Sequence, residues 1–418
     1  MKPVFLSPGI GDNRPTATLY YGQDVRETLR SLPDASVHTV CTSPPYFGLR
    51  DYGKEEQIGL EDSPEEYIQS LVEVFREVKR VLRPDGTLWL NLGDSYNAGG
   101  RVSHGTRVGF KQLSNRASSQ GLDSNRPNAP ALKQKDLIGI PWRVAFALQG
   151  EGWYLRQDII WAKPNPMPES VTDRCTKSHE YLFMLAHPDS GGRYFYDSES
   201  IREESRTGSW DSMPAIGGKK HQDNSYPGGD RYSGNSPSND GLRNRRSVWS
   251  IPTRPYVGAH FATWPPELVR PMVLAGSSER GVCSNCGSSW KREVFSETPE
   301  DPKQVSTGGD PTRQDGGYRV KDPSSGGGNV LARVRRASNT WKPTCECKGA
   351  GCIPATVLDP FSGSGTTGMV ALQEGRNYIG IDINEEYLPL AMNRVQELPA
   401  PVKQYELLEE DVLILFGN

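Results

Sequence analysis

The sequence has no long apolar run. No stretch of the 418 residues approaches the ~18 apolar residues that a membrane-spanning helix needs. The start of the chain also lacks a charged segment followed by an apolar one, which is the pattern of a secretory signal. Both absences indicate a cytoplasmic protein without a membrane partner. With 35% hydrophobic and 24% charged residues, the chain can bury one large core or two modest ones.

A large excess of charge of either sign is missing as well. The formal net charge of −3 counts mildly against a nucleic acid as partner. Positive charge is nevertheless concentrated, because residues 101–135 hold seven Lys or Arg against one acid and residues 243–254 hold four Arg and no acid. Both runs lie in Gly-, Ser- and Asn-rich sequence. They are either solvated loops or loops that close over a phosphate backbone.

Strand and helix signals alternate over the first part of the chain and again over its last part, which predicts an α/β fold with a parallel sheet. A Pro-Asp-Gly turn at 84–86 separates the second helix from the third strand. A polar, glycine-rich stretch at 191–246 is too long for an ordinary connection. The expected strands are 16–21, 37–42, 87–92, 154–161, 181–186, 356–359 and 378–382, and the expected helices are 24–32, 64–82, 137–148, 265–274, 366–373 and 385–398.

A glycine loop near the end of the chain has the pattern of a cofactor site. The sequence Asp-Pro-Phe-Ser-Gly-Ser-Gly-Thr-Thr-Gly at 359–368 joins a strand to a helix, and its glycines let the backbone approach a ligand closely. Asp382 ends the next strand, where a carboxylate can accept two ribose hydroxyls. The loop also satisfies the G-x-G-x-x-G pattern of nicotinamide dehydrogenases, and a purely structural turn is a further alternative.

Two features weigh against a dehydrogenase. Asp359 precedes the glycines, and its charge would repel a pyrophosphate but can hold a cationic ammonium group. Only 36 residues follow Asp382, too few for the remaining strands of a dinucleotide-binding fold. The missing strands must therefore come from earlier in the chain. A phosphate loop is excluded because no Gly-Lys-Ser/Thr follows the glycines.

A second motif, Ser43-Pro44-Pro45-Tyr46, follows a buried strand at the sheet edge where α/β proteins place their chemistry. The amino nitrogen of cytosine or adenine is a poor nucleophile, because its lone pair is delocalised into the ring. Acceptors for its hydrogens favour a pyramidal nitrogen, and the Ser43 hydroxyl and the Pro44 carbonyl can supply them. Tyr46 offers a face on which a flipped base can stack.

Together the two motifs resemble those of the DNA amino-methyltransferases. In their β arrangement, a Ser/Asp-Pro-Pro-Tyr box precedes the target-recognition region and a Phe-x-Gly-x-Gly box comes last. The resemblance covers residues 17–200 and 256–400, including Asp-Ile-Ile-Trp-Ala-Lys-Pro-Asn-Pro at 158–166 and His-Phe-Ala-Thr-Trp-Pro at 260–265. It implies a Rossmann-like S-adenosylmethionine-dependent methyltransferase sheet with permuted motif order, a polar recognition insert, and double-stranded DNA as partner, with a cognate restriction enzyme as a further possible partner.

The resemblance also implies roles for individual residues. Asp94, after the strand that follows the catalytic box, either borders the pocket or caps a helix. Ser-Pro-Pro-Tyr is more typical of N4-cytosine enzymes, and Asp-Pro-Pro-Tyr or Asn-Pro-Pro-Tyr of N6-adenine enzymes, so cytosine is favoured and adenine is the alternative. The residues expected to bind the cofactor are Phe261, Ala262, Asp359, Phe361, Gly363, Gly365, Thr366 and Asp382.

Cysteines form two clusters around an insert. Cys283 and Cys286 form a zinc-knuckle pattern, and Cys345 and Cys347 can supply the other two thiolates of a structural Zn²⁺. Cys352 competes with Cys347 as the fourth ligand. The 58 residues between the halves exceed the usual spacing, and free thiols are the alternative. Because sulfur would fill all four positions, a catalytic metal is not expected.

The sequence therefore predicts a DNA methyltransferase with two core halves. Two rivals stay open: a DNA-binding module with an inactive cofactor site, and an amino-methyltransferase acting on RNA or a protein amide. The expected segments are an N-terminal core half with the catalytic box at 1–190, a target-recognition region at 191–255, a core helix segment at 256–280, a cysteine-bounded zinc-ribbon-like insert at 281–353, and a cofactor-binding core half at 354–418.

Overall fold

The structure is a computed structural model that describes residues 3–6, 15–48, 54, 57–97, 129, 131–204, 242–254, 263–297, 320–321, 329–330 and 334–396. The contacts divide the chain into two compact units, one formed by Met1–Asp197, Arg246–Lys291 and Pro343–Asn418, the other by Ser198–Arg245 and Arg292–Lys342. Within the described ranges, no helix is both long and apolar enough to cross a membrane.

The first unit contains a nine-stranded sheet with the order β1-β2-β17-β16-β3-β4-β6-β5-β9. Neighbours from β2 to β4 run parallel, whereas β6 is antiparallel to both β4 and β5, and β1 is antiparallel to β2. The expected parallel arrangement holds from β2 to β4, and the sheet as a whole is mixed because β1 and β6 are antiparallel to their neighbours. The strands are β1 (Val4–Leu6), β2 (Ala17–Tyr21), β3 (Val37–Thr42), β4 (Leu82–Leu92), β5 (Tyr154–Ala162), β6 (His179–Ala186), β9 (Val248–Ser250), β16 (Thr356–Asp359) and β17 (Asn377–Asp382).

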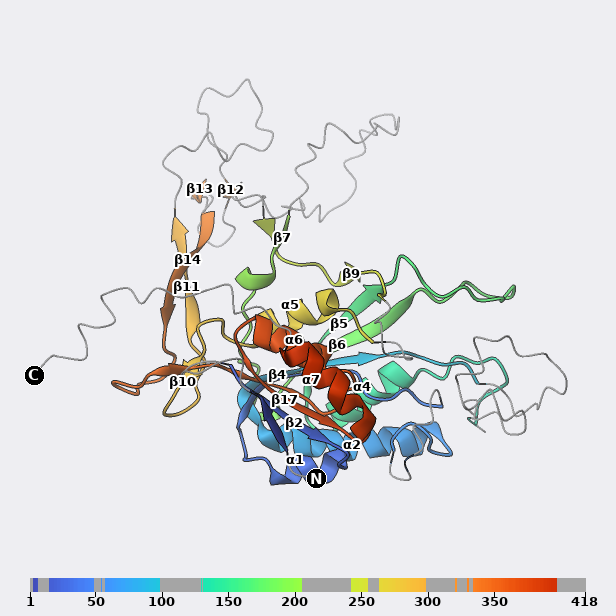
Figure 1. Cartoon of the computed structure of the whole chain (residues 1–418). Helices are drawn as coiled ribbons and strands as arrows, with labels where there is room; N and C mark the ends of the chain where they lie inside the picture. Colours follow the sequence, from blue (N-terminus) through green and yellow to red (C-terminus); the bar gives the residue numbers. More distant parts are fainter. Residues whose placement is uncertain are drawn as a thin grey trace, which may run out of the picture. The chain divides into compact units, whose positions relative to one another are not determined.

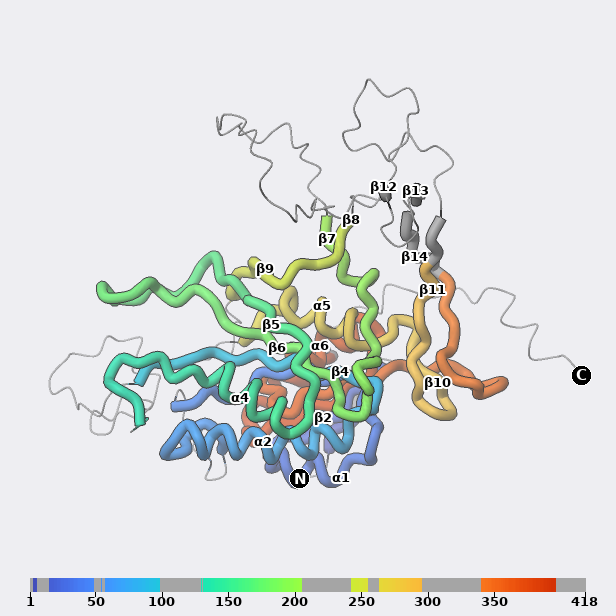
Figure 2. Tube along the Cα trace, turned by 180° about the vertical axis from the view of Figure 1, so that it is seen from behind, coloured from blue at the N-terminus to red at the C-terminus, as the bar shows by residue number. Residues whose placement is uncertain are grey.

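Helices cover both faces of this sheet (Figures 1 and 2). On one face the helices α5, α6 and α7 pack together, and on the other α1, α2 and α4 contribute to an apolar core cluster. This arrangement is the expected Rossmann-like α/β fold, built from both ends of the chain. The helices are α1 (Val25–Ser31), α2 (Pro64–Val81), α4 (Ile140–Gly150), α5 (Pro266–Gly276), α6 (Thr366–Gln373) and α7 (Leu388–Gln396), with short 3-10 turns η2 (Pro188–Ser190), η3 (Glu199–Ile201) and η6 (Glu385–Tyr387).

Local sequence signals explain where the early helices begin. The Asp24 side chain accepts hydrogen bonds from the backbone N–H groups of the first turn of α1. Ser63 does the same for α2, where Pro64 occupies the first turn. The apolar face of α2 is buried, as its helical spacing predicts. These starts match the expected ones.

Three boundaries differ from expectation. The turn at 84–86 is incorporated in β4, where the pairing with β3 shifts register. Helix α4 begins at Ile140 rather than at Leu137, because Leu137 forms a β-bridge with Tyr96. The last helix is divided into η6 and α7.

The remaining strands are short. In the first unit β10 (Val282–Cys283) pairs antiparallel with β15 (Cys352–Ile353). The cysteine-bearing ends of the expected insert thus belong to the first unit, and its middle, 292–342, to the second. The strands β7 (Glu203–Glu204) and β8 (Leu242–Arg243), β11 (Lys291–Glu297) and β14 (Val334–Lys342), and β12 (Val320–Lys321) and β13 (Asn329–Val330) form two-stranded pairs. Most of the first basic run, 101–135, lies outside the described residues, whereas the second, 243–254, lies within them.

Candidate functional site

The two sequence motifs meet at the carboxyl edge of the sheet. Strand β3, which leads into Ser43, lies parallel to β16, which leads into the glycine loop, with Val40 paired to Leu358. At the ends of these strands the Thr42 hydroxyl donates to Oδ1 of Asp359 over 2.7 Å. Residues more than 300 positions apart are therefore bonded to each other.

Asp359 is a buried carboxylate whose oxygens bind the protein itself. Oδ2 accepts from the Thr367 hydroxyl over 2.6 Å, and Oδ1 accepts from the Phe361 backbone N–H over 3.1 Å as well as from Thr42. Burial raises the pKa of Asp359 to about 6, although these hydrogen bonds oppose the rise. The carboxylate thus fixes the loop to β3 and α6, and its role toward the cofactor ammonium stays a prediction.

The loop itself depends on glycine at two positions. Gly363 and Gly365 have φ angles of +52° and +78°, in the left-handed region that other residues rarely adopt. A Cβ atom on Gly365 would lie 2.9 Å from Cβ of Ala391 in α7. Gly365 directly precedes α6, so the loop leads into the first turn of that helix, where Thr366 is buried and its hydroxyl accepts a hydrogen bond from Arg394.

Asp382 ends β17 beside this loop. Its Oδ2 accepts from the Gly363 backbone N–H over 2.7 Å, and its Oδ1 accepts from the Asn384 N–H over 2.8 Å. Burial raises the pKa of Asp382 to about 7. Each carboxylate oxygen keeps a lone pair, so the group can still accept the two hydroxyls of a ribose.

Sequence reasoning missed a chain of hydroxyls beneath the loop. The Ser362 hydroxyl lies 2.7 Å from the hydroxyls of both Tyr21 and Tyr378, and Tyr21 donates to the Gly363 carbonyl over 2.9 Å. Tyr21 pairs with Asp382 in the parallel register of β2 and β17. Its place as the last residue of a strand was a usable signal, since polar residues there face the site.

The catalytic box is held by residues of β4 and α2. Ser43 Oγ donates to Oδ1 of Asn91 over 3.4 Å, and Asn91 Nδ2 donates to the Tyr181 carbonyl over 3.0 Å. Because that second bond orients the amide, the Asn91 oxygen faces the serine. The hydroxyl of Tyr67, in α2, donates to the Pro45 carbonyl over 2.8 Å. Neither Asn91 nor Tyr67 was expected from the sequence.

Tyr46 lies against Gly93, where a Cβ atom would come within 2.5 Å of the tyrosine ring. Its hydroxyl lies 2.6 Å from Oε2 of Glu180 and 3.3 Å from Oδ1 of Asn91. Burial, and then the charge of Glu180, raise the pKa of Tyr46 well above its usual value, so the hydroxyl stays protonated and donates. Lys163 forms an ion pair with Glu180. Neither Glu180 nor Lys163 was singled out from the sequence.

Other expected residues have different outcomes. Oδ1 of Asp94 accepts from the N–H groups of Gly139 and Ile140 over 3.0 Å each, so Asp94 caps α4, which is one of the two roles expected for it. Phe261 and Ala262 lie outside the described residues. Phe361 is partly buried and packs against the main core cluster.

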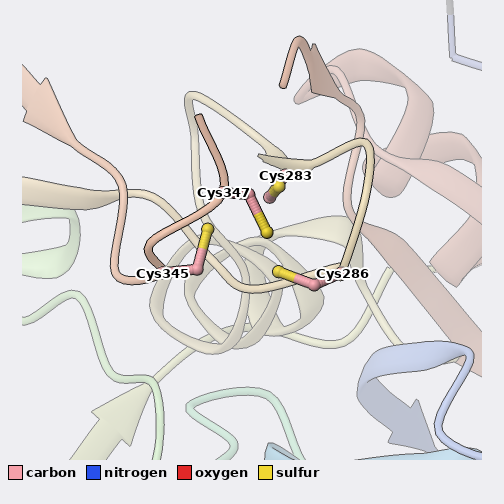
Figure 3. Close-up of side chains that lie close together, drawn as sticks. All are labelled: Cys283, Cys286, Cys345 and Cys347. Carbon is pink, nitrogen blue, oxygen red and sulfur yellow. The ribbon is translucent and has the colours of Figure 1, made fainter. Parts of the chain in front are cut away.

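Four cysteines converge at the base of the expected insert, and Figure 3 shows their side chains lying close together. The sulfurs of Cys283, Cys286, Cys345 and Cys347 all lie within 4.8 Å of one another. Such a set fits the tetrahedral sulfur coordination of Zn²⁺. Cys352 is not in the group, and its sulfur donates instead to the Arg280 carbonyl over 3.0 Å. The geometry therefore selects Cys347 as the fourth candidate ligand.

The proximity of these thiols limits how many of them ionise together. Hydrogen bonds from the side chain and backbone of Ser288 lower the pKa of Cys286, which promotes its thiolate form. The pKa of Cys347 is raised, because Cys286 and Cys345 lie beside it and disfavour a second negative charge. Four thiolates can thus coexist only with a compensating positive ion.

The cysteine knuckle, residues 283–287, is hydrogen-bonded to the amino-terminal ends of strands β3 and β4. Arg83 Nη1 donates to the Cys286 carbonyl over 2.9 Å. The His38 ring accepts the Thr356 backbone N–H at Nδ1 over 3.0 Å, so its Nε2 carries the proton and donates to the Gly287 carbonyl over 3.1 Å. Burial, and then the charge of Arg83, lower the pKa of His38 to about 4, which keeps the ring neutral.

Comparisons with known proteins identify the family of the chain. A family model described as DNA methylase matches residues 37–284 and 354–393. The Type II methyltransferase M.Cfr9I of Citrobacter freundii is 40% identical over 381 residues, covering 91% of this chain and 88% of that protein. For M.SmaI of Serratia marcescens the identity is 37% over 372 residues, covering 89% and 88%. A solved structure, PvuII DNA methyltransferase (cytosine-N4-specific), has a TM-score of 0.46 at 15% identity, covering 99% of this chain and 96% of that one. Since the family model spans more than half of the sequence, the chain belongs to the DNA methylase family.

Proposed function

We propose that the protein is a site-specific DNA methyltransferase that transfers a methyl group from S-adenosylmethionine to the exocyclic amino group of a flipped base, N4 of cytosine. The observation that carries the proposal is the hydrogen bond between Thr42 and Asp359. It joins the end of the catalytic strand to the glycine loop. A base at Ser43–Tyr46 and a cofactor at 359–366 would therefore lie side by side.

The residues of the glycine loop fit a nucleoside with a cationic side chain. Asp382 has lone pairs for two ribose hydroxyls, and the positive φ angles of Gly363 and Gly365 keep the loop backbone open to close approach. Asp359 adds negative charge below the loop. When bound, S-adenosylmethionine supplies an electrophilic methyl group on a sulfonium. We assign Phe261 and Ala262 to the same site by the resemblance of their segment alone.

The catalytic box would activate the amino group by accepting its hydrogens. Because Ser43 gives its own proton to Asn91, the lone pairs of its oxygen are free for an N–H of the base. The Pro44 carbonyl is the second acceptor, and the two prolines fix its direction. Tyr46 would stack on the flipped base, which aims the amino nitrogen at the methyl group for direct in-line displacement. No thiolate nucleophile is required.

The choice of cytosine rests on Ser43, since a serine at this position is more typical of N4-cytosine enzymes in the resembling family. The partner is double-stranded DNA, read by the region 191–255. Because the relatives are Type II methyltransferases, we also propose a cognate restriction enzyme that recognises the same sequence. The four clustered cysteines are proposed to hold a structural Zn²⁺.

Mass spectrometry of nucleosides tests the proposal directly. Mixed-sequence DNA is incubated with the protein and S-adenosylmethionine, with Ser43→Ala as the matched control that removes one acceptor together with the 3.4 Å bond to Asn91. N4-methylcytosine is the expected product. N6-methyladenine would keep the mechanism and reverse the base. Absence of both products, with cofactor binding demonstrated by calorimetry, would turn attention to RNA and protein amides.

A further inference from the structure

Glu180 and Lys163 form a charged pair next to the catalytic tyrosine that the mechanism above does not use. Glu180, in β6, pairs with Trp161 of β5, and Lys163 follows two residues later on the same face. The side chains of Lys163 and Glu180 are only 18% and 14% exposed. An ion pair shielded from water to this extent is screened less than a surface pair, and removing one partner leaves the charge of the other uncompensated.

Both carboxylate oxygens of Glu180 have a partner. Oε2 accepts from the Tyr46 hydroxyl over 2.6 Å, and Oε1 accepts from the Lys163 ammonium. A phenol has one proton to donate, and the shorter contact identifies Glu180 rather than Asn91 as its acceptor. The Lys163 ammonium also lies 4.3 Å from the centroid of the Trp161 ring, which holds the lysine from its other side.

The tyrosine ring has a second constraint that works together with this one. Next to the ring is Gly93, which has no Cβ, so the ring fits against the backbone of the segment that follows β4. The register of β4 with β6 pairs Leu92 with Tyr181 and so brings Glu180 to the neighbourhood of Gly93. The contact with Gly93 sets the position of the Tyr46 ring, and the hydrogen bond to Glu180 holds its hydroxyl end.

We propose that Glu180, itself held by Lys163, is a positioning residue that fixes the plane of Tyr46 for stacking on the target base. This proposal rests on the proposed function, because a stacked base is its premise. It predicts that Glu180 acts through the Tyr46 hydroxyl rather than by touching the substrate. The carboxylate is a suitable anchor because a charge-assisted hydrogen bond is stronger and shorter than a neutral one.

A double-mutant cycle tests this prediction. Glu180→Leu and Tyr46→Phe each remove the same hydrogen bond, and each should lower kcat/KM for DNA by roughly 10- to 100-fold, mainly through kcat. The double variant Tyr46→Phe/Glu180→Leu should be no slower than the slower single variant, because the bond can be lost only once. Glu180→Gln keeps an acceptor for the hydroxyl and should recover part of the rate.

Controls separate positioning from folding. The affinity for S-adenosylmethionine, measured by calorimetry, should stay unchanged in the Glu180 variants. Glu169→Leu breaks another ion pair, with Arg174 at 2.6 Å, in the connection between β5 and β6, and should leave kcat at the wild-type level. Lys163→Met leaves Glu180 without its cation and should also lower kcat.

The outcomes are distinguishable from failure of the proposed function. If the wild-type protein methylates no DNA, the proposed function fails and the cycle is not reached. If it methylates DNA but the two single effects multiply in the double variant, Glu180 acts independently of the Tyr46 hydroxyl and the proposal is overturned. A kcat loss that tracks a fall in Tm across all variants, Glu169→Leu included, would overturn it as well.

Discussion

The two ends of strand β3 are joined to the same segment of the chain in different ways. At the carboxyl end, Thr42 donates to Asp359 next to the glycine loop. At the amino end, His38 connects the backbone of Thr356 to the carbonyl of Gly287 in the cysteine knuckle. Both sets of bonds join β3 to the segment around β16. The residues at the two ends of β3 differ, however, in how many hydrogen bonds they can still accept.

At the amino end both ring nitrogens of His38 have a partner, and their bonds go to backbone groups. At the carboxyl end, Ser43 and Asp382 keep free lone pairs after their bonds within the protein are counted. One end of the strand is therefore suited to stability and the other to binding and chemistry. Substitutions should separate these two properties.

The largest effect on stability is expected at the cysteine knuckle. Cys286→Ser, or removal of metal with a chelator, should lower the free energy of unfolding by about 3 kcal/mol, because a structural zinc site contributes binding energy to folding. For a chain of 418 residues, that loss lowers Tm by roughly 3 to 5 °C. Differential scanning calorimetry, with metal content measured in parallel, checks the prediction.

Cys352→Ser is the matched control for that experiment. Cys352 lies on β15 next to the cluster, and its sulfur donates to the Arg280 carbonyl, which a serine hydroxyl can also do. We expect full metal content and little change in Tm. Loss of metal in Cys352→Ser, with metal retained in Cys347→Ser, would contradict the assignment of the fourth ligand.

The next effect concerns binding at the other end of the strand. Asp382→Asn should weaken S-adenosylmethionine binding by roughly 10- to 100-fold, because the proposed acceptor of the two ribose hydroxyls becomes neutral and brings an N–H₂ group toward the backbone N–H of Gly363 or Asn384. Isothermal titration calorimetry measures the change. Cys286→Ser should bind S-adenosylmethionine with wild-type affinity at a temperature where it is folded. Equal losses of affinity in both variants would contradict the assignment of binding to one end of β3 and stability to the other.

The same carboxylate gives binding a pH dependence of known sign. The pKa of Asp382 is about 7 in the free protein, so affinity should rise with pH up to about 7 and then level off, and Asp382→Asn should flatten that part of the profile. Stability of the free protein changes the opposite way. The pKa of Asp382 in the folded protein lies above its ordinary value of 3.8. Asp382 therefore contributes its full stabilisation below pH 3.8, and this contribution is lost as the pH rises through about 7.

Local sequence signals predicted much of the fold and of the candidate site. The glycine loop was predictable because positive φ angles at Gly363 and Gly365 leave few residue choices, and strand β16 matches its expected range. The Ser43–Tyr46 motif was predictable because two prolines end the strand before it. The cysteines were visible from their spacing, but only three-dimensional proximity distinguishes Cys347 from Cys352.

What the sequence did not predict depends on pairing between distant strands. Glu180 meets Tyr46 because β6 runs antiparallel to β4, and 134 positions separate the two residues. No local pattern encodes that contact. The pairing changes from parallel to antiparallel at the same place, since β5 and β6 follow one another without a helix and form an antiparallel pair.

The smallest expected effect is at Arg83, which reaches from the start of β4 to the knuckle. Arg83→Met removes the bond from Nη1 to the Cys286 carbonyl and the ion pair with Asp85 at 3.1 Å. The loss should be about 1 kcal/mol, because one exposed hydrogen bond and one ion pair are removed while the apolar stem is kept. Faster metal loss to a chelator at unchanged kcat would show that Arg83 contributes to stability and not to catalysis. A drop in kcat at full metal content would show instead that the two ends of β3 are coupled through the strand.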